Sequence, residues 1–140
     1  MDRLFNTVAI VVGIAGGIIS SAFGGFDILI KALLIMTVLD YILGVIKAIY
    51  NKELSSEIGF KGLIKKFVMF LVVVLSVVLQ KIVGDAIIIR DITIMFFIAN
   101  EGISILENAA VFIPLPDVLK NTLMQLRDKD KEQESEYNRD

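Results

Sequence analysis

The sequence predicts an all-α membrane protein with three to four transmembrane helices, four being favoured as two hairpins, followed by a short amphipathic helix and a charged tail. Hydrophobic residues make up 56% of the 140 residues and mean hydropathy is +0.75, whereas an ordinary globular domain holds about 45–50% apolar residues. Charged residues gather in a few short stretches, and four long apolar segments lie between them. This pattern indicates a chain whose apolar surface is covered by lipid.

Four segments approach the length of about 20 apolar residues that crosses about 30 Å of hydrocarbon as a helix. They are residues 4–23, 28–50, 67–89 and 92–113. The turns 24–27 and 90–91 join them into two hairpins, and the polar stretch 51–66 joins the hairpins. An alternative interpretation of the first segment is a secretory signal peptide, but Arg3 is offset by Asp2 and the small residues at its end only loosely resemble a cleavage site. An uncleaved span is therefore favoured.

Positive charge predicts the orientation of these spans. The stretch 51–66 carries a cytoplasmic basic set, made of Lys52, Lys61, Lys65 and Lys66, whereas the two short turns carry only Arg90. We expect this stretch in the cytoplasm, with a serine cap before Glu57 and the lysines on anionic headgroups. Four spans then place both termini inside. A three-span alternative, in which the first segment does not cross, places the tail outside.

The end of the chain predicts three changes of structure, which divide it into a transmembrane domain (1–113), an amphipathic helix (114–126) and a disordered tail (127–140). Pro114 and Pro116 stop the preceding helix because proline lacks the amide hydrogen. Asp117 is then placed to cap a helix with an apolar stripe. That stripe consists of Val118, Leu119, Leu123 and Leu126. The last 14 residues hold four basic and six acidic groups, too little apolar surface to order themselves.

The composition also excludes classes of function. The chain has no His, Cys or Trp, so the usual zinc, haem, iron–sulfur and thiol chemistry lacks ligands and nucleophiles. We expect no metal, no cofactor and no catalytic residue. A net charge of −2 gives no electrostatic footprint for nucleic acid, and no phosphate-binding glycine loop is present. The protein is therefore not expected to be an enzyme.

Small residues recur at every fourth position of the first segment, in the row Ala9, Gly13, Gly17 and Ser21. Such rows let two helices approach closely in lipid. Contact between copies and packing within one chain are equally good interpretations of this row.

Asp40 lies near the middle of the second segment and shares a helix face with Gly44 and Lys47. Lys47 is about 10 Å away by helical rise, too far for contact. A carboxylate in hydrocarbon costs at least roughly 2.5–3.5 kcal/mol, so it needs a partner, a proton or water. A face that becomes wet in an assembly is one interpretation. An ion pair with a lysine of a neighbouring span is slightly favoured.

The fourth segment carries the densest polar pattern. Five polar residues fall on one arc of about 120°, and they are Asn100, Glu101, Ser104, Glu107 and Asn108. Such an arc lines water or forms hydrogen bonds between helices, and the two interpretations carry equal weight.

Four elements in order resemble the clostridial toxin-secretion/phage-lysis holin family, over about residues 28–126. They are Leu39-Asp40-Tyr41-x-x-Gly44-x-x-Lys47-Ala48, then Leu54-Ser55-Ser56-x-x-Gly59-Phe60-Lys61-Gly62-x-x-Lys65-Lys66, then Ile98-Ala99-Asn100-Glu101-Gly102-Ile103-Ser104-Ile105-Leu106-Glu107-Asn108-Ala109, and Ile113-Pro114-Leu115-Pro116.

The resemblance implies a multi-pass phage protein of the bacterial cytoplasmic membrane that oligomerises with itself and permeabilises the bilayer. It would release an endolysin for lysis, or a toxin, with an antiholin as a further possible partner. Two rival interpretations come from other classes. A small multi-pass transporter or proton-coupled exporter would be expected to place an essential Glu in its first span, where this chain has none. An antiholin or membrane anchor would keep the same pattern without forming lesions.

Overall fold

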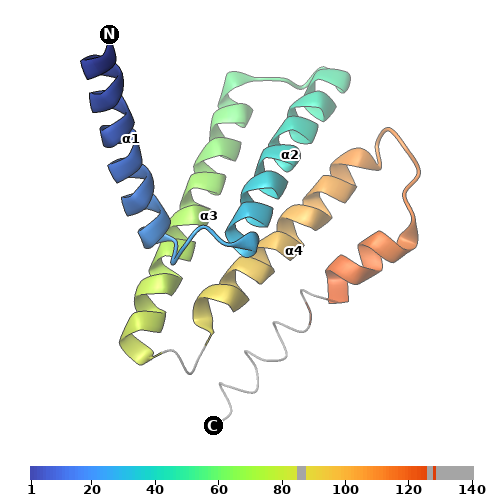
Figure 1. Cartoon of the computed structure of the whole chain (residues 1–140). Helices are drawn as coiled ribbons and strands as arrows, with labels where there is room; N and C mark the ends of the chain where they lie inside the picture. Colours follow the sequence, from blue (N-terminus) through green and yellow to red (C-terminus); the bar gives the residue numbers. More distant parts are fainter. Residues whose placement is uncertain (85–87, 126–127, 129–140) are drawn as a thin grey trace.

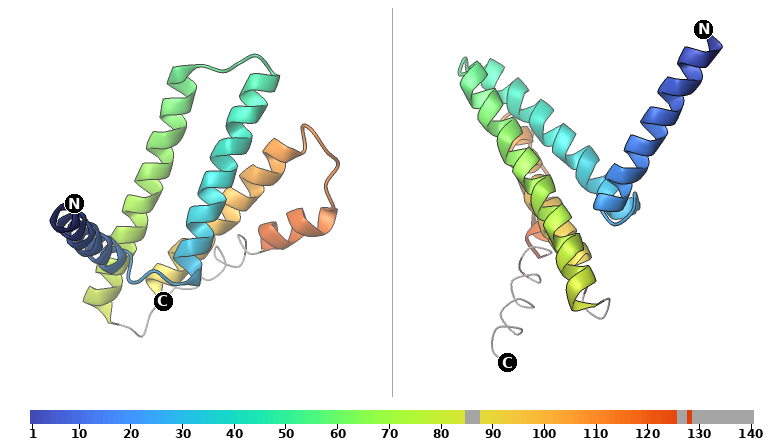
Figure 2. Two further views of the ribbon diagram at one scale, coloured as in Figure 1. Left: turned by 45° about the horizontal axis from the view of Figure 1, so that its top comes forward. Right: turned by 90° about the vertical axis from the view of Figure 1, so that its left-hand side faces the viewer.

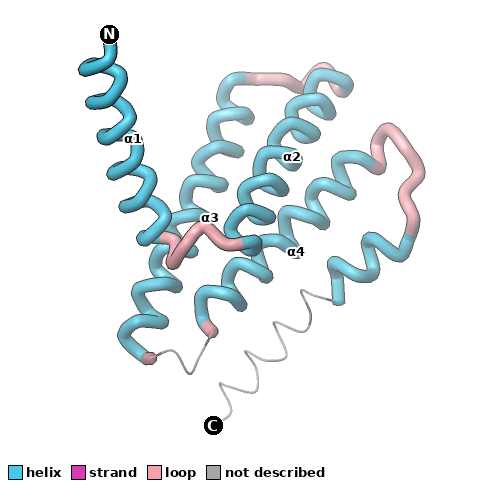
Figure 3. Tube along the Cα trace, viewed as in Figure 1, coloured by secondary structure: helices cyan, strands magenta, loops and turns pink. Residues whose placement is uncertain are grey.

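The computed structural model describes residues 1–84, 88–125 and 128, and every regular element within them is helical. Figure 1 and Figure 3 show the four long helices, which are α1 (Asp2–Ala22), α2 (Ile28–Tyr50), α3 (Ser56–Val83) and α4 (Ile89–Ala109). A shorter helix covers residues 117–125. The prediction of an all-α chain is confirmed for this part of the protein.

The boundaries of the third helix differ from the prediction. The expected loop 51–66 is wrong beyond residue 55, because α3 begins at Ser56 and ends at Val83. The Ser55 side chain accepts a hydrogen bond from the Ile58 amide at 3.1 Å and so caps the helix. One turn on, Glu57 and Lys61 form an exposed ion pair of 2.8 Å, a spacing that supports a helix. The polar residues after Ser55 therefore continue the helix instead of breaking it.

Three helices, α1, α2 and α3, are long and apolar enough to cross a membrane by length and composition. At 28 residues, α3 is about 42 Å long, which exceeds the hydrocarbon thickness of about 30 Å. Part of α3 thus has room to stand outside the hydrocarbon. The helix α4 is not in this group, so the fourth span stays a prediction.

The helix α4 packs against both α2 and α3, whereas α2 and α3 contact each other little. Figure 2 shows α2 and α3 joined at their upper ends by the connection between them. The apolar core where the three helices meet consists of Ile30 and Leu33 from α2, Met69 and Val73 from α3, and Ile94 from α4. This core occupies the half of the bundle that lies near the start of α2.

The helix α1 stands apart from the other three. All side chains from residue 1 to residue 19 are exposed, and Figure 2 shows α1 and α2 diverging from their shared turn. The turn expected between the first two helices is present, but the expected packing of α1 against α2 as a hairpin is wrong. At that turn the Gly24 amide donates to Ser21 O and the Gly25 amide to Ser20 O, with Gly24 at a φ of 73°. This is the Schellman end of a helix, for which glycine is favoured.

The C-terminal helix begins at residue 117 after the two prolines, so Asp117 is its first helical residue and not the residue before it. It folds back onto the bundle, because the Leu123 side chain reaches Gly102 of α4. A Cβ atom at Gly102 would lie 2.8 Å from Leu123 Cδ1 and 2.9 Å from Met36 Cε. The expected disordered tail 127–140, apart from residue 128, and the stripe residue Leu126 lie outside the described residues.

Candidate functional site

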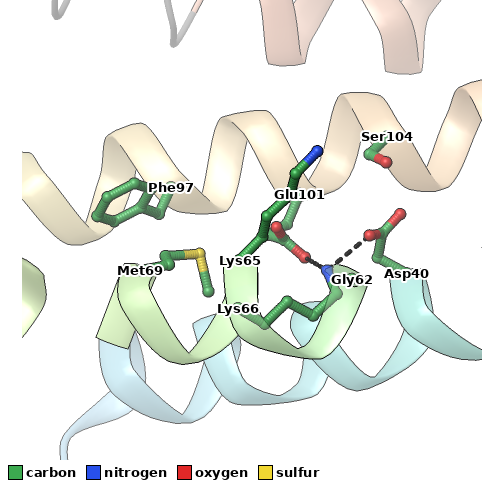
Figure 4. Close-up of a pocket in the computed structure, with 8 residues that line it drawn as sticks. All are labelled: Asp40, Gly62, Lys65, Lys66, Met69, Phe97, Glu101 and Ser104. Atoms are coloured by element: carbon green, nitrogen blue, oxygen red, sulfur yellow. Dashed lines mark hydrogen bonds and ion pairs between the residues drawn. The ribbon is translucent and has the colours of Figure 1, made fainter. Parts of the chain in front are cut away.

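Three charged side chains from three helices meet in the middle of the bundle (Figure 4). The Lys66 Nζ of α3 donates to Asp40 Oδ2 of α2 at 2.7 Å and to Glu101 Oε2 of α4 at 2.6 Å. The side chains are only 12–14% exposed. Two carboxylates thus share one ammonium, and we call Asp40, Lys66 and Glu101 the ion cluster. The favoured interpretation of Asp40, an ion pair with a lysine of a neighbouring helix, agrees with this geometry.

Asn108 extends the ion cluster toward the end of α4. Its Nδ2 donates to Asp40 Oδ1 at 3.1 Å, so both oxygens of this carboxylate have partners. Gly44 lies one turn beyond Asp40 on α2, and a Cβ atom placed there would sit 3.8 Å from Asn108 Nδ2. This is an ordinary van der Waals distance, so an alanine at position 44 would also leave the amide its place beside Asp40.

Two open clefts adjoin the ion cluster, and Asp40 and Lys66 line both. The larger, about 350 Å³, is also bordered by Lys65, Ser104 and Phe97. The smaller, about 180 Å³, runs toward the connection between α2 and α3 and is bordered there by residues that include Leu54 and Gly59. At about 30 Å³ per water, the larger cleft has room for on the order of ten waters. The charged groups lie where water could join them.

The predicted polar arc of α4 divides into two halves. Glu101, Ser104 and Asn108 face the ion cluster or its clefts. Asn100 is half-buried and Glu107 is exposed. The division follows from helical geometry, because Glu101, Ser104 and Asn108 fall within about 60° of one another while Asn100 and Glu107 lie on one flank.

The basic residues expected in the cytoplasmic loop also take different positions. Lys61 and Lys65 are exposed on α3, and Lys52 is exposed in the connection with a φ of 58°. Lys66 faces inward to the ion cluster, which the loop interpretation did not foresee. Lys47 is half-buried and forms no ion pair with Asp40 among the described contacts, as its distance along the helix predicted.

The glycines of the small-residue row of α1 contact no other helix within the described residues. A Cβ atom added at Gly13 or Gly17 would meet no atom within 4 Å, and Ser21 is exposed. Packing of this row inside one chain is therefore not what the structure shows.

A second charged site lies at the start of α2, around the buried Arg90 of α4. Its Nε donates to Phe23 O at 2.6 Å and its Nη2 to Gly25 O at 3.2 Å. Both outer nitrogens reach the Asp27 carboxylate, at 2.8 and 3.0 Å. We call Arg90 with Phe23, Gly25 and Asp27 the Arg90 clasp, because one side chain holds the whole turn between α1 and α2.

The clasp was not found from the sequence, where Arg90 counted only as an isolated charge in a turn. Its surroundings explain why it is buried. Gly24 has room only for a hydrogen, since a Cβ atom there would lie 2.9 Å from Arg90 Cδ and Nε. The Asp91 carboxylate accepts a further bond at 2.9 Å. The paired guanidinium holds the pKa of Asp27 below its usual range, mainly through the hydrogen bond to Arg90.

Comparison with known proteins shows similarity to bacteriophage holins. A model described as the bacteriophage holin family matches residues 17–128. A probable holin of Bacillus phage phi105 is 35% identical over 105 residues, which cover 74% of this chain and 77% of that protein. An uncharacterised 14.9 kDa protein of Clostridium perfringens is 38% identical over 131 residues, 92% of this chain and 99% of its own length. An uncharacterised protein of Listeria monocytogenes is 39% identical over 126 residues, 89% and 90% of the two chains. No solved structure matches.

We expect Lys66→Met to destabilise the bundle by about 3 kcal/mol, because removing one partner of a buried pair leaves the other charges uncompensated. The matched control Lys65→Met changes an exposed lysine without an ion pair among the described residues and should have little effect. Removing all three charges, with Asp40→Asn and Glu101→Gln added to Lys66→Met, should restore most of the stability. Unfolding in detergent micelles, followed by circular dichroism, measures all three variants. Equal stability of the Lys66 and Lys65 variants would contradict the ion pairs of Lys66 with Asp40 and Glu101.

The lowered pKa of Asp27 predicts a pH dependence. The Asp27 carboxylate adds to stability fully above the ordinary aspartate pKa of about 3.9, and this contribution is lost as the pH falls through the lowered value. Asp27→Asn keeps the N-cap of α2 but loses the charge. The parent should therefore be more stable than Asp27→Asn at neutral pH, and the difference should vanish in strong acid. A difference that stayed constant throughout an acid titration would contradict the ion pair.

Proposed function

This chain belongs to the bacteriophage holin family, and we propose that it assembles with copies of itself in the host cytoplasmic membrane and permeabilises it, so that an endolysin reaches the cell wall. The action needs no catalytic residue or cofactor. The observation that carries the proposal is the ion cluster beside its clefts. Two of the three helices that form it, α2 and α3, are long and apolar enough to cross a bilayer.

The depth of the ion cluster supports this function. Asp40 is about 18 Å from the start of α2 by helical rise, roughly the middle of a bilayer about 30 Å thick. Charged groups at such depth are expensive in lipid and mark paths for water or ions. Within one copy, Lys66 and Asn108 satisfy the carboxylates. When copies assemble and the helices separate, water from the clefts can replace these partners.

The exposed α1 supports assembly. Its glycines have no contact with their own chain, so a neighbouring α1 can approach them closely, and close approach multiplies small dispersion contacts. We infer that the row Ala9, Gly13, Gly17 and Ser21 is a contact between copies.

Induced expression in a bacterium without an endolysin tests the function. We expect abrupt loss of membrane potential and viability after a period of accumulation. An antiholin or an anchor would accumulate in the membrane without either loss. A transporter or exporter would leave the potential intact until its substrate is supplied. Either result would contradict the proposal.

The ion cluster provides the matched variant for this assay. The neutral triple variant Asp40→Asn, Lys66→Met and Glu101→Gln should accumulate normally but delay or abolish permeabilisation, because it lacks the charges that hydrate an opening. The control pair Glu57→Gln with Lys61→Met removes an exposed ion pair and should act on the parental schedule. Parental timing of the triple variant, at equal protein level, would remove the ion cluster from the opening.

Topology is tested with single cysteines in this cysteine-free chain. Ser56→Cys and Ser135→Cys should resist a membrane-impermeant thiol reagent in intact cells, because we place both on the cytoplasmic side. Phe26→Cys, in the exposed turn before α2, is the control and should react. Reaction at position 135 with protection at position 56 would favour three spans over four.

A further inference from the structure

The position of α1 depends on its last residues alone. From residue 1 to residue 19 no side chain is buried or half-buried, so the length of the helix gives no packing that could set its direction. At its end, Phe23 packs edge-on against Phe70 of α3, with ring centroids 5.8 Å apart and planes at 81°. Whatever holds the turn after α1 therefore decides where α1 points.

The hydrogen bonds of the Arg90 clasp hold that turn, and among the described contacts none of them reaches the helix α1 itself. The four bonds to the turn reach the carbonyls of Phe23 and Gly25 and both oxygens of Asp27, all of which come after the last helical residue, Ala22. The base of the clasp is fixed as well, because the Arg90 amide donates to Gln80 Oε1 of α3 at 3.0 Å. The turn is thus tied to α3 and α4 together.

An arginine suits this position for a geometric reason. Its planar guanidinium carries five donors in a rigid fork, which can reach two carbonyls and a carboxylate at once. A lysine would keep the charge but offers one rotatable nitrogen. The charge alone would not fix the direction of the turn.

We propose that Arg90 is a positioning residue: its clasp on the turn 23–27 fixes the direction in which α1 leaves the body formed by α2, α3 and α4, and this fixed direction speeds the contacts between copies that permeabilise the membrane. The second half rests on the proposed function. The physical reason is preorganisation, since a helix already held in its binding direction loses less orientational freedom when it meets a partner.

The first half is tested by a distance measurement that needs no activity. Val8→Cys on α1 and Leu75→Cys on α3, both exposed, carry spin labels in membranes, and excess unlabelled parent separates the labelled copies. The parent should give one narrow distance distribution. Asp27→Asn preserves the N-cap of α2 but should lower the ratio of clasped to free turns by about tenfold, which broadens the distribution. Arg90→Lys should broaden it too, whereas Asp91→Asn, which touches Arg90 from the same helix, should change it little.

The second half is tested by the timing of potential loss with the same variants. Asp27→Asn and Arg90→Lys should accumulate like the parent and permeabilise later, and Asp91→Asn should keep the parental schedule. Distributions as narrow as the parent's in both clasp variants would overturn the positioning role. Broad distributions with unchanged timing would overturn the link to permeabilisation. Failure of the parent itself to depolarise cells would instead count against the proposed function, because the distance result does not depend on it.

Discussion

The bundle depends on one ammonium shared by two carboxylates. In hydrocarbon an unpaired charge is costly, so Asp40 on α2 and Glu101 on α4 must both stay within reach of Lys66 on α3. This requirement sets the register of three helices at once. It matters most between α2 and α3, which make few direct contacts and are bridged by α4. The ion cluster supplies the specific tie that apolar side chains in lipid do not provide.

The residues along α2 lie in three different environments. Asp27 at its start belongs to the Arg90 clasp, Ile30 and Leu33 belong to the apolar core, and Asp40 belongs to the ion cluster. The core between the two charged sites is well packed, whereas clefts open at the ion cluster. The packed end of α2, at the Arg90 clasp and the apolar core, therefore fixes how the helices are placed. The part of α2 beside the clefts has space in which the helices can move apart. The exposed α1 is attached at the packed end.

The sequence predicts the helical class and the bounds of α2 well, because long apolar runs are read directly from hydropathy. The start of α3 was missed although a serine cap before Glu57 was expected, because the polar residues after Ser55 lower the hydropathy and were assigned to the loop. That error also concealed Lys66, which counted as a loop residue, so the partner of Asp40 was predicted in kind but not in identity. The Arg90 clasp was beyond prediction, since it joins residues more than 60 positions apart and half of its bonds go to backbone carbonyls.

The energetics of the ion cluster suit the function that we propose, in which the helices are packed in an isolated copy and separated by water in an assembly. A buried ion pair is often no more stable than apolar residues of the same shape, because desolvation offsets the attraction. Breaking it in dry lipid is costly, whereas replacing its partners by water is nearly balanced. The ion cluster therefore resists separation of the helices in an isolated copy. In the assembly that we propose, water that enters through the clefts can replace these partners at little cost. A core of leucine and valine at the same depth would hold the helices together without tolerating water, so in the opening that we propose these polar groups are the ones that would face it.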